Sequence, residues 1–395
     1  MNNAALYIHI PWCIKKCPYC DFNSHEVKKD VPETQYIQAL IEDFKRDITL
    51  FGRRNISSVF IGGGTPSLFS AQSYKILFNE LKDLAYFDKN IEITIEANPG
   101  TIDLNYLADY RKLGINRLSL GVQSLHDNLL KKIGRIHSAQ EAINAIKIAK
   151  NSGFDNINVD LMYGIPTQTL QDGINDIKKA IDLDIQHISW YQFTIEKNTY
   201  FYKHPPPNMP SEAMAAKLEQ QALDLLKAAG FIRYEISAFK KHNYAAKHNL
   251  NYWNFGDYFG IGAGAHGKLT ELNNKSIIRT QKPRLPQSYL AAIDAIAMDL
   301  SLRKDDINLH LKTLTINDII FEFMLNTTRI YDKIPITLFT QQTRLPISII
   351  EPLWKNAETN GLIILDSTHW TVSELGRRFT NDLQIEFLLP ATEIK

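Results

Sequence analysis

The sequence predicts an α/β fold in which a parallel sheet is built from repeated strand–helix units. Short, apolar, β-branched segments alternate with longer amphipathic segments along the first half of the chain. The intervals of roughly 30 to 50 residues each leave room for one helix and its loops, which is typical of βα units rather than hairpins. The predicted strands are, in chain order, residues 6–10, 58–61, 91–95, 117–121, 157–161 and 187–194.

The helices between these strands are marked by their ends. Ser138 stands three residues before Glu141, and this capping-box pattern predicts a helix over residues 139–151. Two longer amphipathic helices are predicted over residues 35–50 and 211–229, each closed by a glycine.

Residues suited to binding or catalysis follow the predicted strands at the same place in each unit. In (β/α) barrels the active site is built from the C-terminal ends of the strands, so these side chains are expected to meet. They are the cysteine loop after the first strand, then residues 62–66, residues 96–99, Gln123, Asp160 and Glu196.

The strand–helix alternation stops near residue 300, where a smaller module begins. Helices are predicted over 318–326 and 348–360, followed by a hairpin over 361–372. This order predicts a small α+β domain that resembles a winged helix. The predicted division of the chain is 1–235 for the barrel, 236–300 for an extension and 301–395 for the C-terminal domain.

Composition excludes some functions. The net charge is +1, from 44 basic and 43 acidic residues, which argues against nucleic acid as the main partner and against DNA binding by the winged-helix-like module. The N-terminus lacks the basic region of a signal peptide, and no stretch approaches the ~20 apolar residues that span a bilayer. Free thiols suit a reducing compartment, so the protein is expected in the cytoplasm.

The three cysteines of the chain fall in one run with the spacing C-x3-C-x2-C. They are Cys13, Cys17 and Cys20. Three clustered thiols predict a metal site with one ligand position left open, and a [4Fe-4S] cluster held by three thiolates has such a position on its fourth iron. A zinc site completed by His9 or His25 is the alternative, although zinc motifs usually add a second ligand pair after a gap.

The segment from residue 7 to residue 23 resembles the radical S-adenosylmethionine (SAM) enzymes, in particular their coproporphyrinogen dehydrogenase-like (HemN) branch. The resemblance implies a partial, six-stranded (β/α)6 barrel in which the three cysteines hold a [4Fe-4S] cluster. It also implies that the fourth iron chelates the amino and carboxylate groups of SAM and delivers the electron that cleaves SAM to a 5′-deoxyadenosyl radical.

The same resemblance assigns SAM-binding residues. Gly63, Gly64 and Thr65 lie in a GGTP-type segment that binds the amino group of SAM, where glycines let the backbone approach closely. A guanidinium suits the carboxylate of SAM, and acidic side chains suit its ribose hydroxyls. The alternative for the glycine segment is a plain tight turn. The tyrosines could instead be packed around the cluster, and the acidic residues could be solvated residues at strand ends. The remaining assigned positions are Tyr7, Tyr19, Glu96, Gln123, Arg135 and Asp160.

Two departures separate the chain from the coproporphyrinogen dehydrogenases. They carry a fourth cysteine two residues after the third, where this chain has Phe22, and an N-terminal extension, whereas Tyr7 stands near the start here. Residues 248–253, HNLNYW, resemble the H-N-x-x-Y-W motif of the heme chaperones of this branch. The motif implies that His248 ligates heme iron, with His266 as the second candidate. Tyr252 and Trp253 are expected to pack on the porphyrin, and the alternative is a histidine packed beside core aromatics.

These observations predict a heme chaperone that binds a [4Fe-4S] cluster, SAM and heme and passes heme to acceptor proteins. The alternatives are an oxygen-independent coproporphyrinogen III dehydrogenase and a zinc protein. SAM turnover, a homodimer and peripheral membrane contact are left open. Residues 262–267 match G-x-G-x-x-G, the pattern of dinucleotide-binding sites, which requires a helix directly after it. The residues that follow do not have a helical pattern, so we expect a loop near the barrel mouth there.

Overall fold

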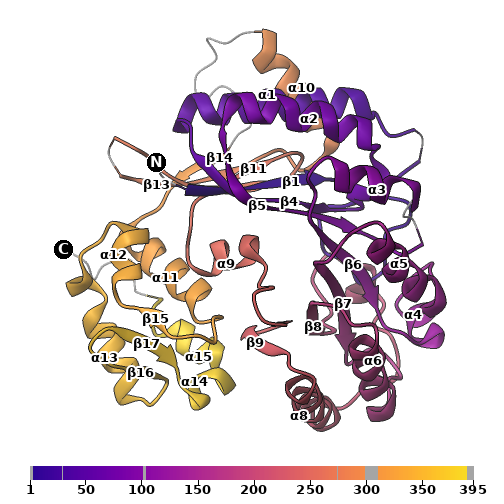
Figure 1. Ribbon diagram of the computed structural model, residues 1–395. Helices are drawn as coiled ribbons and strands as arrows, with labels where there is room; N and C mark the ends of the chain where they lie inside the picture. Colours follow the sequence, from indigo (N-terminus) through magenta and orange to yellow (C-terminus); the bar gives the residue numbers. More distant parts are fainter. Residues whose placement is uncertain (1–2, 29, 101–103, 274, 299–309, 389–395) are drawn as a thin grey trace.

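The computed structural model describes residues 3–28, 30–100, 104–273, 275–298 and 310–388 (Figure 1). Within them, one large sheet has the strand order β14-β13-β12-β11-β1-β4-β5-β6-β7-β8-β10-β9. Its centre is a run of strands that are parallel to their neighbours and follow chain order, as predicted. These strands are β1 (Asn3–Ile10), β4 (Asn55–Gly63), β5 (Tyr86–Ala97), β6 (Arg117–Gln123), β7 (Ile157–Tyr163) and β8 (His187–Gln192).

Helices connect successive parallel strands and lie on the outside of the curved sheet (Figure 1). The predicted capping box is confirmed, because Ser138 Oγ accepts a hydrogen bond from the Glu141 backbone N–H at the start of α5. The partial (β/α)6 barrel predicted from the sequence is therefore confirmed. The crossover helices are α1 (Glu33–Phe51), α2 (Ala71–Leu84), α3 (Leu104–Lys112), α4 (Asp127–Lys132), α5 (Ala139–Asn151) and α6 (Leu170–Asp182).

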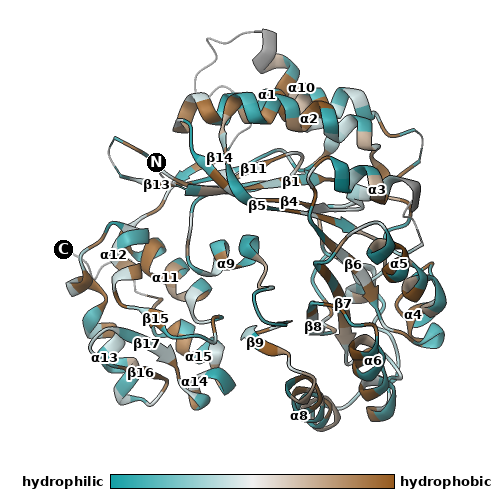
Figure 2. Ribbon diagram, viewed as in Figure 1, coloured by the Kyte–Doolittle hydropathy of each residue, from teal (hydrophilic) through white to brown (hydrophobic). Residues whose placement is uncertain are grey.

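The two faces of the parallel strands differ in chemistry. Successive side chains of a strand point to opposite faces, so a residue and its second neighbour share a face. On β6, Leu118 and Leu120 belong to the apolar core, whereas Ser119 and Gln123 line a pocket on the other side. Figure 2 shows hydrophobic residues along these strands and hydrophilic ones on the outer faces of the helices. The inner face of the barrel is thus partly polar and suited to a ligand.

The sheet continues beyond the barrel on both edges. Strand β11 adds to β1 in parallel and is followed by antiparallel strands, while β10 and β9 follow β8. The glycine-rich residues 262–265 form a turn between β11 and β12. A strand follows this turn instead of a helix, as predicted. The added strands are β9 (Ile232–Glu235), β10 (Ala238–Lys240), β11 (Tyr258–Ile261), β12 (His266–Thr270), β13 (Ile277–Gln281) and β14 (His310–Thr313).

Three helices accompany this extension. Helix α8 (Glu212–Ala228) packs against α6, and α10 (Pro286–Met298) packs against α1. The short helix α9 (Lys247–Trp253) lies between the sheet and the C-terminal domain (Figure 1).

The C-terminal domain has a hydrophobic core of its own, around Phe323, Trp354 and Trp370. Its helices and small sheet have the predicted order, including the hairpin of β16 and β17. The predicted boundary between residues 300 and 301 lies outside the described residues, and β14 still belongs to the large sheet. The elements are α11 (Ile316–Thr327), β15 (Ile334–Pro335), α12 (Thr337–Thr343), α13 (Glu351–Thr359), β16 (Ile363–Leu365), β17 (His369–Val372), α14 (Glu374–Arg378) and α15 (Thr380–Ile385).

Among the described residues, none of the helices combines the length and the apolar character that crossing a bilayer requires.

A cysteine-lined pocket at the barrel mouth

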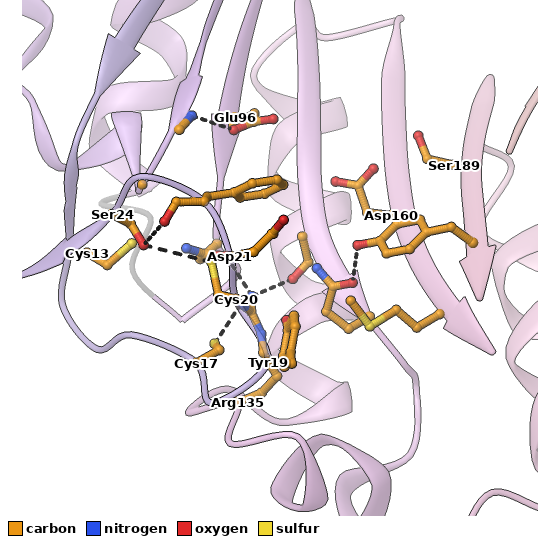
Figure 3. A pocket seen from close by; sticks show the side chains of 18 of the residues that line it. Cys13, Cys17, Tyr19, Cys20, Asp21, Ser24, Glu96, Arg135, Asp160 and Ser189 are labelled. Atoms are coloured by element: carbon orange, nitrogen blue, oxygen red, sulfur yellow. Dashed lines mark hydrogen bonds between the residues drawn. The ribbon is translucent and has the colours of Figure 1, made fainter. Parts of the chain in front are cut away.

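A cavity of about 360 Å³ lies at the C-terminal ends of the parallel strands. Figure 3 shows the three cysteines on one side of it and Asp160 with Ser189 on the other. This volume falls within the range of ligand pockets, and its wall mixes apolar and polar groups. Most of the residues predicted to bind the cluster or SAM line it: Cys13, Cys17, Tyr19, Cys20, Gly63, Gly64, Glu96, Gln123, Arg135 and Asp160.

Each cysteine sulfur has a polar side chain beside it. Thr65 Oγ1 donates to Cys13 Sγ over 3.5 Å, and Arg135 Nη1 donates to Cys17 Sγ over the same distance. Ser24 Oγ lies 3.8 Å from Cys20 Sγ. Hydrogen bonds to sulfur stabilise the thiolate form that binds metals.

The three thiols fit an iron–sulfur cluster better than a single metal ion. Within the described residues, no three Cys, His, Asp or Glu side chains converge closely enough to hold one ion. A cluster can bind each thiolate through a different iron, which suits three cysteines that lie together on one side of a cavity. Burial raises the pKa of Cys13 and of Cys20, so a bound metal must displace their protons.

The histidines of the zinc alternative are placed differently. Both ring nitrogens of His9 are hydrogen bonded, Nδ1 to the Tyr7 hydroxyl over 2.9 Å and Nε2 to the Asn23 carbonyl over 2.8 Å. His25 Nε2 is buried and has no hydrogen-bond partner among the described residues. Neither His9 nor His25 lines the cavity, so the structure gives the zinc alternative no support.

The glycine-rich segment after β4 needs its glycines to reach the cysteine loop. A Cβ on Gly64 would lie 2.4 Å from the Trp12 carbonyl oxygen, far inside contact distance. Gly63 has φ +113° and donates its N–H to Glu96 Oε2 over 3.1 Å. Thr65 lines a smaller hollow behind the main pocket, beside Cys17. The segment thus connects the cysteine loop to the pocket wall.

The acidic residues of the pocket are held in a low-dielectric setting. Burial, with repulsion from Asp160, raises the pKa of Glu96 to about 7. Burial also raises the pKa of Asp160, although Asn158 Nδ2 donates to its Oδ1 over 2.8 Å. Buried carboxyls of this kind gain from a ligand that supplies hydrogen-bond donors or positive charge.

Gln123 ends β6 in a conformation that side chains rarely adopt. Its φ is +70°, in the left-handed region, where a residue other than glycine persists only when its surroundings hold it. Its Oε1 accepts a hydrogen bond from the Tyr191 hydroxyl over 2.9 Å. Such strain at a pocket wall is typical of binding sites.

Several residues of the pocket were not predicted from the sequence. Ser119, Met162, Ser189 and Tyr191 line the cavity from the middle and ends of strands β6 to β8. The available signal was their spacing, because each stands two residues from another inward-facing position on its strand.

Two predicted sites lie away from the pocket. Tyr7 points to His9 and to the rings of Phe60 and His248, and does not line the cavity. His248 is 1% exposed, and both of its ring nitrogens are engaged, with Ser58 Oγ at 3.1 Å and the Tyr252 hydroxyl at 2.9 Å. Burial, and to a smaller extent Arg117, lowers its pKa to about 3. This conformation offers no free nitrogen to heme iron, so ligation by His248 requires helix α9 to open.

Tyr252 and Trp253 line a second cavity of about 210 Å³ beside the C-terminal domain. The Trp253 indole N–H is buried and has no hydrogen-bond partner in the described part of the chain. The Arg329 guanidinium lies 4.3 Å from the centre of the Trp253 ring. The other candidate ligand, His266, is exposed at the start of β12.

The chain is similar to known proteins along most of its length. Residues 7–180 match the radical SAM superfamily and residues 314–379 match the HemN C-terminal domain. The chain is 43% identical to the heme chaperone HemW of Haemophilus influenzae over 388 residues, 97% of each chain. It is 41% identical to the heme chaperone HemW of Escherichia coli over 384 residues, 97% of this chain and 98% of that protein.

The solved structure of the coproporphyrinogen III oxidase HemN from Escherichia coli has the same fold. It is 21% identical with a TM-score of 0.80, covering 98% of this chain and 90% of that one. Fold and site together define a radical SAM protein, a class that implies a [4Fe-4S] cluster and SAM. Within that class, the chain belongs to the HemW family.

Proposed function

We propose that this protein is a heme chaperone that binds a [4Fe-4S] cluster, SAM and heme and passes heme to acceptor proteins. The observation that carries the proposal is the 43% identity, over 97% of the chain, to a protein named as a heme chaperone. Phe22 supports it, because coproporphyrinogen dehydrogenases have a cysteine at the matching position and this residue is a 61% exposed phenylalanine at the pocket.

In this proposal Cys13, Cys17 and Cys20 hold the cluster, which when bound supplies an electron and one open coordination position. The chain's own residues prepare the cavity beside it. The glycine segment at the end of β4 runs close to the cysteine loop, because a Cβ on Gly64 would lie 2.4 Å from the Trp12 carbonyl oxygen. Arg135 provides positive charge for the carboxylate of SAM.

The acidic residues of the wall complete the SAM site. Glu96 and Asp160 accept hydrogen bonds from the ribose hydroxyls. Burial raises the pKa of both carboxyls, and hydrogen bonds donated by a ligand would stabilise their charged form. Tyr19 closes the cavity beside the cysteines, and Gln123 lies on the same wall. Gly63 and Thr65 are assigned to the amino group of SAM, as in the family, whereas the side chain of Tyr7 packs on His9 and Phe60 away from this cavity.

We assign the heme contact to the end of helix α9. The cavity beside Tyr252 and Trp253 is about 210 Å³, below the ~300 Å³ at which ligand pockets usually begin. It therefore holds an edge of a porphyrin rather than a whole one. Heme ligation by His248 would need its bond to Ser58 or its bond to Tyr252 to break, whereas His266 is already exposed.

Partners and location follow the same proposal. Heme and heme-accepting proteins are the partners, the cytoplasm is the compartment, and nucleic acid is not a partner. Three clustered thiols suit a reducing compartment, and the near-neutral net charge of +1 disfavours nucleic acid. A homodimer and peripheral membrane contact are left open.

The test uses anaerobically purified protein reconstituted with iron and sulfide. Hemin is added to one sample, and coproporphyrinogen III with SAM and a reductant to another. We expect a Soret band that survives gel filtration, heme transfer to a heme-free acceptor protein, and no protoporphyrinogen IX. Decarboxylation of coproporphyrinogen at catalytic rates would instead favour the dehydrogenase. H248A and H266A, compared side by side, identify the axial ligand through the heme spectrum.

A further inference from the structure

A chain of side-chain hydrogen bonds joins two cysteine sulfurs behind the pocket, and Asn98 is its centre. Asn98 Nδ2 donates to Thr65 Oγ1 over 2.9 Å, and Thr65 Oγ1 donates to Cys13 Sγ over 3.5 Å. On the other side, Asn98 Oδ1 accepts from Arg135 Nη2 over 2.6 Å, and Arg135 Nη1 donates to Cys17 Sγ over 3.5 Å. The Asn98 carboxamide therefore contacts both side chains that donate hydrogen bonds to the two cysteine sulfurs.

We propose that Asn98 is a positioning residue that sets the hydrogen bonds received by Cys13 and Cys17 and thereby tunes the reduction potential of the cluster. This inference rests on the cluster of the proposed function. Asn98 lies on the loop directly after β5, and it lines both the main pocket and the hollow behind it. It is therefore next to the cluster site without being one of its ligands.

The carboxamide is suited to this position because it donates from one end and accepts at the other. The N–H that Asn98 gives to Thr65 occupies a lone pair of the hydroxyl oxygen, so the hydroxyl proton is left to point at Cys13. Donation into a hydroxyl also polarises it and strengthens the hydrogen bond that it donates. At the other end, the amide oxygen fixes the guanidinium plane of Arg135, whose donors form a rigid fork.

The surroundings leave room for this arrangement. Arg135 Nη2 also donates to the Gly121 carbonyl over 2.6 Å. A Cβ on Gly121 would lie 3.0 Å from Asn98 Oδ1 and 3.5 Å from Arg135 Nη2. The first distance is tighter than ordinary contact, so a glycine here keeps the carboxamide and the guanidinium in place. Strand β6 thus provides both an acceptor and the necessary space.

Hydrogen bonds to the sulfurs are among the factors that set the potential of an iron–sulfur cluster. They stabilise the more electron-rich, reduced state, so the Asn98 chain should raise the potential. Cys20 stands outside the chain, because its neighbour is Ser24 Oγ at 3.8 Å. Loss of Asn98 should therefore act on two of the three thiolates at once.

The experiment is a redox titration of the reconstituted cluster, followed by electron paramagnetic resonance, in wild type and in N98A. We expect the reduced-to-oxidised ratio at a fixed potential to fall about tenfold in N98A, a downward shift of ~59 mV for one electron. N98S serves as the second variant, because serine is polar but too short to bridge both partners, and it should shift the potential in the same direction.

N116A is the matched control. Asn116 likewise bridges two groups, accepting from the Ile93 N–H over 2.8 Å and donating to the Ile91 carbonyl over 2.7 Å, but it precedes β6 at the other end of the barrel. N116A should leave the potential unchanged. A shift equal to that of N98A would mean that general loosening of the barrel explains the effect, and would overturn the inference.

A double-mutant comparison tests the route of the effect. T65V removes the donor to Cys13, so N98A should shift the potential less in the T65V background than in wild type. Fully additive shifts, or a wild-type potential in both N98A and N98S with full iron content, would overturn the role of Asn98 alone. Failure of wild type to assemble any cluster would instead refute the proposed function, and this inference with it.

Discussion

The cysteine pocket and helix α9 are both predicted ligand sites, yet the structure prepares them differently. In the pocket, Arg135, Glu96 and Asp160 face an open cavity. On α9, His248 has used both ring nitrogens inside the protein and is 1% exposed. Residue types identify both sites, but the partners of each side chain decide which site is ready to bind. The pocket is open to a ligand as it stands, whereas heme ligation by His248 would require α9 to open.

The two sites should also differ in how they affect the stability of the fold. Buried polar groups that are fully paired contribute to stability, while groups kept for a ligand cost stability until the ligand arrives. Substitutions in the pocket should therefore remove cofactors with little effect on folding. Substitutions at the buried end of α9 should destabilise the fold even when no ligand is present.

The largest effect is expected for Cys17→Ala. Loss of one of three thiolates should abolish the cluster, measured as iron content and as visible absorbance after anaerobic reconstitution. The free energy of unfolding of the iron-free protein should change by less than about 1 kcal/mol, since Cys17 is only half buried. Ser24→Ala is the control, because it removes a neighbour of Cys20 and no ligand. Full iron content in Cys17→Ala would contradict the cluster assignment.

Gly64→Ala should come next. The added Cβ would meet the Trp12 carbonyl oxygen at 2.4 Å and push the cysteine loop away from β4. We expect cluster assembly or SAM binding to weaken at least ~10-fold, which corresponds to about 1.4 kcal/mol, measured by titrating SAM against the signal of the reduced cluster.

Gly114→Ala is the matched control for this glycine. Gly114 has φ +97° but open space around its Cβ position. The substitution should destabilise the fold by about 1 kcal/mol through backbone strain and leave SAM binding intact. Equal losses of SAM binding in both variants would mean that general destabilisation of the barrel, rather than the contact with Trp12, explains the effect of Gly64→Ala.

His248→Ala tests the contribution of helix α9 to stability. It removes a buried imidazole that packs on Phe60 and bonds to Ser58 and Tyr252, so urea unfolding of the iron-free protein should show a loss of about 2–4 kcal/mol. Tyr252→Phe breaks one of these bonds and should cost about 1 kcal/mol. An unchanged stability in His248→Ala would show that α9 is already open in solution.

The last prediction concerns the pH dependence of stability. The folded pKa of Glu96 is raised from 4.5 to about 7, so the folded state binds its proton more tightly than the unfolded state does. Glu96 should therefore have little effect on the stability of the ligand-free protein below about pH 4.5, and the free energy of unfolding should fall by roughly 3 kcal/mol as the pH rises towards 7. Glu96→Gln should flatten this part of the urea-midpoint profile. A profile of the same slope in both proteins would contradict the pKa shift.

Much of the fold and part of the site could be predicted from the sequence. Periodicity and strand-end residues identified the parallel strands, because those signals lie within a few consecutive positions. The pairing of Gln123 with Tyr191, 68 residues away, depends on strand order and register. The burial of His248 depends on Ser58, 190 residues away. A motif therefore indicated which residue types were present, but not which of them were already paired.

The pairing of β1 with β11 has a consequence for how the protein is made. Strand β1 lies between β4 and β11, and Asn23 at the end of the cysteine loop donates to the carbonyl oxygens of Ala263 and Arg284. The first of these partners comes 240 residues later in the chain. On the ribosome, the cysteines emerge long before the segments that brace their loop. Iron should therefore be inserted after synthesis of the barrel is complete, and a nascent chain that stops before residue 263 should not retain it.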